Sequence, residues 1–221
     1  MTEIQFNEIK ERLKQWRQER HLTYENQRKD FLGNVFEKAS EYFRAKDDLE
    51  RVDALCDIAV FCFNAFDVEH HLYYCSDIDK EISKIENIIN NMSWFIFRAR
   101  NNINLNITIG EIICYCRFLC ENFEFDFYKC MLEKIKEIES RTGFYDERLK
   151  KFVDTICAFS KDEALSNVSK DFGFLGNSII YKLTQEDKNF WFITCKEIET
   201  NLQIDYKVKK IYKADYKSCR L

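Results

Sequence analysis

Apolar side chains recur every three or four residues along the first two thirds of the chain, which is the period of an amphipathic helix. The third of these apolar stretches is the most hydrophobic and is expected to lie at the centre of a helical bundle. The pattern predicts helices over residues 3–20, 24–46, 49–66, 78–100, 107–122 and 125–139, with a loop over 67–76.

Beyond residue 144 the pattern is weaker. Segments 190–195 (FWFITC) and 202–212 (LQIDYKVKKIY) are rich in β-branched and aromatic residues and alternate only weakly, so they suit either a β-hairpin or further helix. The chain has no proline and only 5 glycines, which favours long helices over a many-stranded sheet. We therefore predict an all-α bundle of about five to seven helices, with at most a short β-hairpin near the C-terminus.

The predicted domain organisation is a helical domain over residues 1–155 and a C-terminal extension over 156–221 that packs on it. The net charge of −4, with lysine and arginine spread along the chain, indicates no nucleic-acid partner. No apolar run approaches the ~20 residues that a membrane-spanning helix needs. Several of the 10 cysteines lie within apolar helical patterns and the N-terminus lacks a signal-like segment, so we expect reduced thiols and a cytoplasmic location.

Two pairs of acidic residues lie on consecutive predicted helices. Glu37 and Glu41 are four residues apart, as are Asp53 and Asp57, so each pair places two carboxylates on one helix face. Asp57 precedes the apolar run IAVFCFNAF, where a charge is rarely left unpaired. Carboxylates that meet across a helical hairpin would form an oxygen-rich site suited to Mg²⁺. The alternative is that both pairs lie on ordinary solvated helix faces.

Two cations on the sixth predicted helix form a second candidate site. Lys134 and Arg141 are seven residues apart in the segment MLEKIKEIESRTG and so share a helix face. A lysine and an arginine in this arrangement could bind a polyphosphate. The alternative is a salt-bridged helix surface in which Glu137 pairs with Arg141.

The order of these motifs resembles the MazG-like nucleoside triphosphate pyrophosphohydrolases, an all-α superfamily common in phages and bacteria. The resemblance covers residues 24–66 and 112–155, and the closing YKADYKSCRL also looks like the ending of phage-type members. It implies an often dimeric helical bundle that binds Mg²⁺ through ExxE and ExxD motifs. It further implies cleavage of the nucleotide between its α- and β-phosphates. By position, Glu41 and Asp57 match the second acid of each motif.

The sequence departs from this motif at two positions. Lys38 stands where the first acid of ExxE would be, and Ala54 stands where the first acid of ExxD would be. Glu37 and Asp53 each lie one residue earlier, which still reaches the same helix face. A non-catalytic member of the same fold therefore remains open.

The resemblance implies a Mg²⁺-dependent enzyme that converts a nucleoside triphosphate into a monophosphate and pyrophosphate, with Mn²⁺ able to substitute. It also implies a homodimer. A catalytically degenerate interaction or regulatory protein is the alternative, and a scaffold without a site is a third. The expected metal ligands are Glu37, Glu41, Asp53 and Asp57, with Glu37 and Glu41 also catalytic, Lys134 and Arg141 on the phosphates, and Phe36, Trp94 or Phe97 beside the base.

Overall fold

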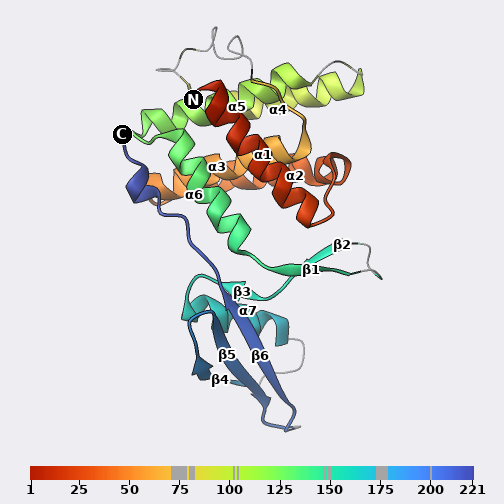
Figure 1. Cartoon of the computed structure of the whole chain (residues 1–221), viewed down its shortest axis with the longest axis vertical. Helices are drawn as coiled ribbons and strands as arrows, with labels where there is room; N and C mark the ends of the chain where they lie inside the picture. The colour runs from red at the N-terminus through yellow and green to blue at the C-terminus, as the bar shows by residue number, and fades with distance from the viewer. Residues whose placement is uncertain are drawn as a thin grey trace. The chain divides into compact units, whose positions relative to one another are not determined.

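The computed structural model describes residues 1–70, 79, 83–101, 103, 105–146, 148, 151–172, 179–199 and 201–221. The chain divides into two compact units (Figure 1). The helical unit comprises Met1–Ile135 and Ala214–Leu221, and the sheet unit comprises Lys136–Lys213. The last residues of the chain therefore belong to the unit in which the chain begins.

The helical unit has the predicted succession of helices. Except at the start of α4, the helix ends differ from the predicted ones by no more than two residues, and residues 71–76 of the predicted loop lie outside the described residues. The elements are α1 (Glu3–Glu19), α2 (Tyr24–Arg44), α3 (Asp48–Ala65), α4 (Ile85–Arg100), α5 (Asn106–Asn122), α6 (Phe127–Ser140, whose last turn lies in the sheet unit) and the 3₁₀ turn η2 (Tyr216–Cys219).

Polar side chains at the N-termini explain where the first three helices begin. Thr2, Thr23 and Asp47 each accept a hydrogen bond from a backbone N–H in the first turn of the following helix. Such caps satisfy amide groups that have no partner within the helix. α4 begins later than predicted, at Ile85; positions 78 and 80–82 lie outside the described residues.

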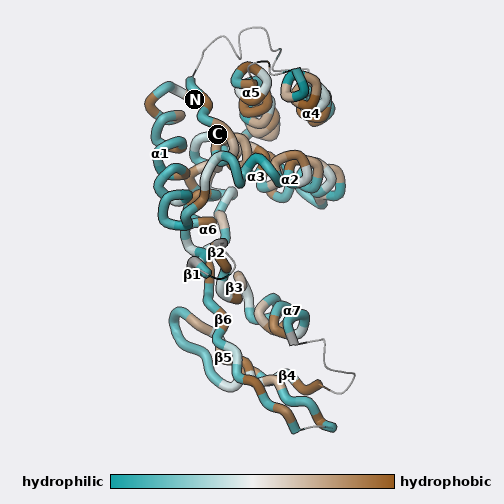
Figure 2. The backbone as a smooth tube through the Cα atoms, turned by 90° about the vertical axis from the view of Figure 1, so that its right-hand side faces the viewer, coloured by the Kyte–Doolittle hydropathy of each residue, from teal (hydrophilic) through white to brown (hydrophobic). Residues whose placement is uncertain are grey.

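The core of the helical unit forms around α3, which packs against α1, α2 and α5. Leu55, Ile58 and Phe63 on α3 are fully or almost fully buried, as is Phe31 on α2. The most hydrophobic predicted helix is thus central, as expected. α1, in contrast, is mostly hydrophilic with a few hydrophobic positions (Figure 2), as expected for a helix that buries one face.

The all-α prediction is wrong, because the last third of the chain is an α+β unit. It contains a four-stranded sheet in the order β3-β6-β5-β4, in which β3 runs parallel to β6 and the other neighbours are antiparallel. A separate hairpin precedes it. The elements are β1 (Gly143–Asp146), β2 (Lys151–Asp154), β3 (Cys157–Ala158), α7 (Lys161–Phe172), β4 (Ile179–Glu186), β5 (Phe190–Glu197) and β6 (Gln203–Lys210).

The β-hairpin that the pattern allowed over 190–195 and 202–212 is present as the antiparallel pair β5 and β6, but the rest of the sheet was not predicted. The pattern did not decide for strand there, because β5 is apolar on both of its faces. Trp191, Ile193 and Cys195 point into a core with α7, as the alternating burial of the strand shows. Phe190 and Phe192 point the other way, so FWFITC contains almost no polar residue at the positions that alternation requires. A strand with aromatic residues on its outward face does not show the period of two that identifies a half-buried strand.

Candidate functional site

The predicted acidic residues of α3 meet the predicted lysine of α6. The Nζ atom of Lys134 lies 2.7 Å from Oδ1 of Asp53 and 2.9 Å from Oδ1 of Asp57. The Lys134 side chain is only 3% exposed and that of Asp57 only 13%. One buried ammonium group therefore bridges two carboxylates that lie one helical turn apart.

Lys38 on α2 binds the other side of the same carboxylate. Its Nζ atom lies 3.2 Å from Oδ2 of Asp57 and 2.8 Å from Oε2 of Glu41. Both oxygens of Asp57 thus contact an ammonium group. The residue that departs from the ExxE motif is the one that links the predicted acids of α2 and α3.

The C-terminal segment completes the site. The hydroxyl of Tyr216 in η2 donates a 2.7 Å hydrogen bond to Oδ1 of Asp53. Next to it, the backbone N–H of Asp215 donates to Oε2 of Glu133 on α6 at 3.1 Å. We call the set of Lys38, Glu41, Asp53, Asp57, Lys134 and Tyr216 the acid–lysine cluster.

The charges of the cluster nearly cancel. Three carboxylates and two ammonium groups leave one formal negative charge. Burial would lower the pKa of Lys38, but Asp57 and Glu41 outweigh it, and the pKa lies above its ordinary value. Lys38 is therefore a cation at neutral pH.

Burial and neighbouring charges shift the pKa values of Asp53 and Asp57 in opposite directions. Burial would raise the pKa of Asp53, but Lys134 and the hydroxyl of Tyr216 overcome it and hold that pKa below its ordinary value. Burial raises the pKa of Asp57, and the Asp53 carboxylate adds to this, while the two lysines oppose it. Burial also raises the pKa of Tyr216 well above its ordinary value, so Tyr216 remains a hydrogen-bond donor.

The donor set of the cluster does not fit a resident Mg²⁺ ion. Magnesium needs several oxygen ligands in octahedral geometry, and a carboxylate that already pairs with lysine supplies them poorly. Within the described ranges, no group of three or more histidine, cysteine, aspartate or glutamate residues is arranged to hold a metal ion. The ammonium groups of Lys38 and Lys134 contact both oxygens of Asp57, so its charge is already compensated without a metal ion.

The structure places the remaining predicted site residues outside the cluster. Glu37 is exposed on α2. Arg141 lies in the sheet unit, where a guanidinium nitrogen is 3.4 Å from Oε1 of Glu137. The aromatic residues expected beside a nucleotide base are each about half exposed: Phe36, Trp94 and Phe97.

The sequence pattern indicates most members of the cluster but not Tyr216. Lys38 was visible as a departure from the motif, although its role as a bridge was not. Tyr216 is 163 residues from Asp53 in sequence, and no local pattern connects the two. A hydrogen bond over such a separation is set by tertiary packing rather than by any local signal.

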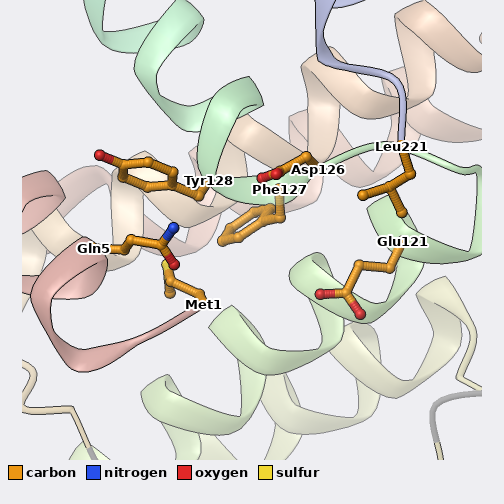
Figure 3. A pocket seen from close by; sticks show the side chains of 7 residues that line it. All are labelled: Met1, Gln5, Glu121, Asp126, Phe127, Tyr128 and Leu221. Atoms are coloured by element: carbon orange, nitrogen blue, oxygen red, sulfur yellow. The ribbon is translucent and has the colours of Figure 1, made fainter.

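Two hollows in the helical unit lie away from the cluster. A pocket of about 200 Å³ is lined by residues at the starts of α1 and α6, with Gln5 and Tyr128 on one side of Phe127 and Glu121 and Leu221 on the other (Figure 3). A second, of about 510 Å³, is lined by Lys10, Lys14 and Arg17 of α1. The two lysines pair with Asp67 and Glu11, and Arg17 donates to the carbonyl oxygen of Phe63 and to Asn64. Neither hollow is lined by a residue of the cluster.

Comparison with protein-family models, curated proteins and solved structures gives no significant match to this chain. In the part of the chain that the structure describes, no helix is both long and apolar enough to cross a membrane. The geometry of the acid–lysine cluster therefore carries the functional argument.

Proposed function

We propose that this protein is a non-catalytic binding or regulatory protein whose helical unit carries lysines where a metal-dependent hydrolase would hold its ion. The observation that carries this proposal is the position of Lys38, whose Nζ lies 2.8 Å from Glu41 and 3.2 Å from Asp57. An ammonium group between two carboxylates satisfies their charge and repels a divalent cation.

The cluster joins separate parts of the helical unit. It contains side chains from α2, α3, α6 and η2, and Lys134 contacts two of its three carboxylates. Breaking a buried ion pair by removing one partner costs about 3–5 kcal/mol, because the remaining charge is left without compensation. We infer that the cluster holds these four elements in register. Eight described cysteines, among them Cys56 and Cys62, are free, which supports a cytoplasmic location. Cys114 is disulfide-bonded and departs from the reduced thiols expected from the sequence.

An assay of pyrophosphate release tests the proposal. The purified full-length chain is incubated with a panel of nucleoside triphosphates and either Mg²⁺ or Mn²⁺. We expect no release above the level of an Asp57→Asn variant, which lacks the central carboxylate charge. Metal-dependent release by the wild-type protein that is lost in Asp57→Asn would overturn the proposal.

The second candidate is the nucleotide pyrophosphohydrolase that the MazG-like resemblance suggests. The convergence of Glu41, Asp53, Asp57 and Lys134 across α2, α3 and α6 favours it. Bound Mg²⁺ or Mn²⁺ would supply the activation of water, and Lys134 would bind a phosphate oxygen of the nucleoside triphosphate. A homodimer belongs to this candidate, and sedimentation of the chain with and without nucleotide would test it.

A further inference from the structure

The four-stranded sheet packs one of its faces against α7, and its opposite face does not take part in that core. The buried residues of β5 are Trp191, Ile193 and Cys195, which form a core with Ala164 and Val168 of α7. The intervening positions of β5 and their cross-strand partners lie on the opposite side, because successive strand residues point to opposite faces. We call this side the open face, and it carries Ile180, Lys182, Phe190, Phe192, Thr194, Lys196, Asp205, Lys207 and Lys209.

Lysines and aromatic rings alternate across this face. Phe190 pairs with Lys209 and Phe192 pairs with Lys207 in the antiparallel register of β5 and β6. The Nζ atom of Lys207 lies 3.9 Å from the centroid of the Phe190 ring, and that of Lys209 lies 5.0 Å from the same centroid. The rings of Phe190 and Phe192 have centroids 6.4 Å apart and are tilted by 53°, so neither ring covers the other.

The open face is strongly positive. It carries four lysines and one acid, Asp205, which accepts a hydrogen bond from Thr194. Lys182, Lys196 and Lys207 are exposed, and Lys209 is partly buried. None of the four forms an ion pair with a carboxylate within the described parts of the chain. Their charge is therefore directed to solvent, although the whole chain has a net charge of −4.

We propose that the open face binds single-stranded nucleic acid, with bases stacking on Phe190 and Phe192 and phosphates contacting the lysines. Aromatic side chains on a sheet surface stack bases without regard to sequence, and neighbouring cations follow the phosphate backbone. The side chains of Lys207 and Lys209, which lie over the Phe190 ring, are flexible and can turn towards phosphate groups. The ring is then free to stack on a base.

The chemistry of the face favours a single strand over other polyanions. An acidic peptide would use the lysines but has no flat ring system for the two phenylalanines. Duplex DNA hides its bases from a flat sheet, because its groove admits a helix or a two-stranded ribbon. The face lies in the sheet unit and shares no residue with the acid–lysine cluster, so this proposal is independent of the function proposed above.

Fluorescence anisotropy of labelled oligo-dT and oligo-U of about 12 nucleotides tests binding by the full-length chain. Titrations between about 50 and 200 mM salt give the number of phosphates contacted. With three or four lysines engaged, we expect a slope of log K against log salt of about −2 to −3. Polyphosphate and duplex DNA of equal charge serve as competitors, and we expect both to compete weakly.

Matched variants assign the binding to the open face. The double change Lys182→Gln with Lys207→Gln should weaken binding roughly tenfold and reduce the magnitude of the slope by about 1.4. The control double change, Lys161→Gln with Lys170→Gln, removes the same charge from exposed positions of α7 and should leave binding within about twofold. Phe192→Leu keeps an apolar residue but removes the ring, and it should weaken binding without altering the salt slope.

Three results would overturn the proposal. The first is absence of binding at the lowest salt concentration. The second is equal displacement by polyphosphate or duplex DNA, which would indicate attraction of charge alone. The third is an equal effect of the α7 control and the open-face variant. Circular dichroism of each variant establishes that the sheet unit remains folded, so that a loss of binding reports on the surface itself.

Discussion

At the scale of single residues, the pairing of Asp57 with Lys38 and Lys134 is the basis for the function proposed for the helical unit. The carboxylate is 13% exposed and both of its oxygens contact ammonium groups. A buried carboxylate without a cation would be costly, and here the chain supplies both cations itself. The sequence identified Asp57 by its apolar surroundings, and Glu41, Asp53 and Lys134 by their helical spacing, although as metal and phosphate ligands and not as ion-pair partners. It could not show that Lys38 takes part, since that depends on how α2 packs against α3.

Replacing Lys134 by methionine should lower the free energy of unfolding by about 3 kcal/mol, because Asp57 keeps its charge in a buried place and loses one of its two cations. Urea denaturation measures the change. Lys14→Met is the matched control: Lys14 pairs with Glu11 on the exposed side of α1 at 3.0 Å, and its loss should change stability by less than about 1 kcal/mol. Equal losses in the two variants would show that the cluster has no special role in stability.

The raised pKa of Lys38 predicts a dependence on alkaline pH. Because the folded state binds this proton more tightly than the unfolded state, the stabilisation is fully present below the ordinary pKa of 10.5 and is lost as pH rises through the higher folded-state pKa. The stability difference between wild type and Lys38→Met should therefore be constant near neutrality and shrink above about pH 10.5. A difference that grows with alkaline pH would contradict the assignment.

At the scale of elements, the helices of the first 140 residues were predictable, whereas α7 and most of the sheet were not. Helices depend on local periodicity and caps such as Thr23 and Asp47, which the sequence displays directly. The strands of the sheet unit pair over long separations, and the outward Phe190 and Phe192 remove the alternation that would have revealed β5. The outward aromatic residues that obscure the strand pattern are also the residues that suggest a binding surface.

Two glycines offer a test of the local structure. A Cβ atom at Gly143, the first residue of β1, would collide with the ring of Phe152 and the carbonyl oxygen of Val153. Gly143→Ala should therefore destabilise the β1–β2 hairpin, by about 1–3 kcal/mol. Gly33 lies exposed within α2, and apart from its own helical turns nothing lies within 4 Å of the position that a Cβ atom would take there. Gly33→Ala should instead stabilise the chain by about 0.5–1 kcal/mol. Thermal unfolding of both variants measures the two signs, and two changes of the same sign would contradict this account.

At the scale of the whole molecule, two units carry different surfaces. Residues 214–221 return to the helical unit, where Tyr216 joins the cluster, while residues 136–213 form the sheet unit. The overall negative charge suggested no nucleic-acid partner, because summing over the chain hides the local excess of lysine on the open face. The net charge of the whole chain therefore does not predict the charge of this single face.

This division predicts that damage to the cluster stays local. In the Lys134→Met variant, amide hydrogen exchange should quicken in peptides from α2, α3 and α6 and remain unchanged in peptides from β4, β5 and β6. Mass spectrometry of the exchanging chain resolves the two groups of peptides. Faster exchange throughout the sheet as well would show that the two units unfold as one.

The most direct test of the central claim is the effect of Mg²⁺ and Mn²⁺ on the melting temperature of the wild-type protein and of Lys38→Glu. A ligand that binds only the folded state raises the melting temperature by mass action. We predict no metal-dependent rise for the wild type, because lysines neutralise the carboxylates, and a rise for Lys38→Glu, in which a fourth carboxylate replaces an ammonium group. A rise in the wild type that equals or exceeds that of Lys38→Glu would contradict the account.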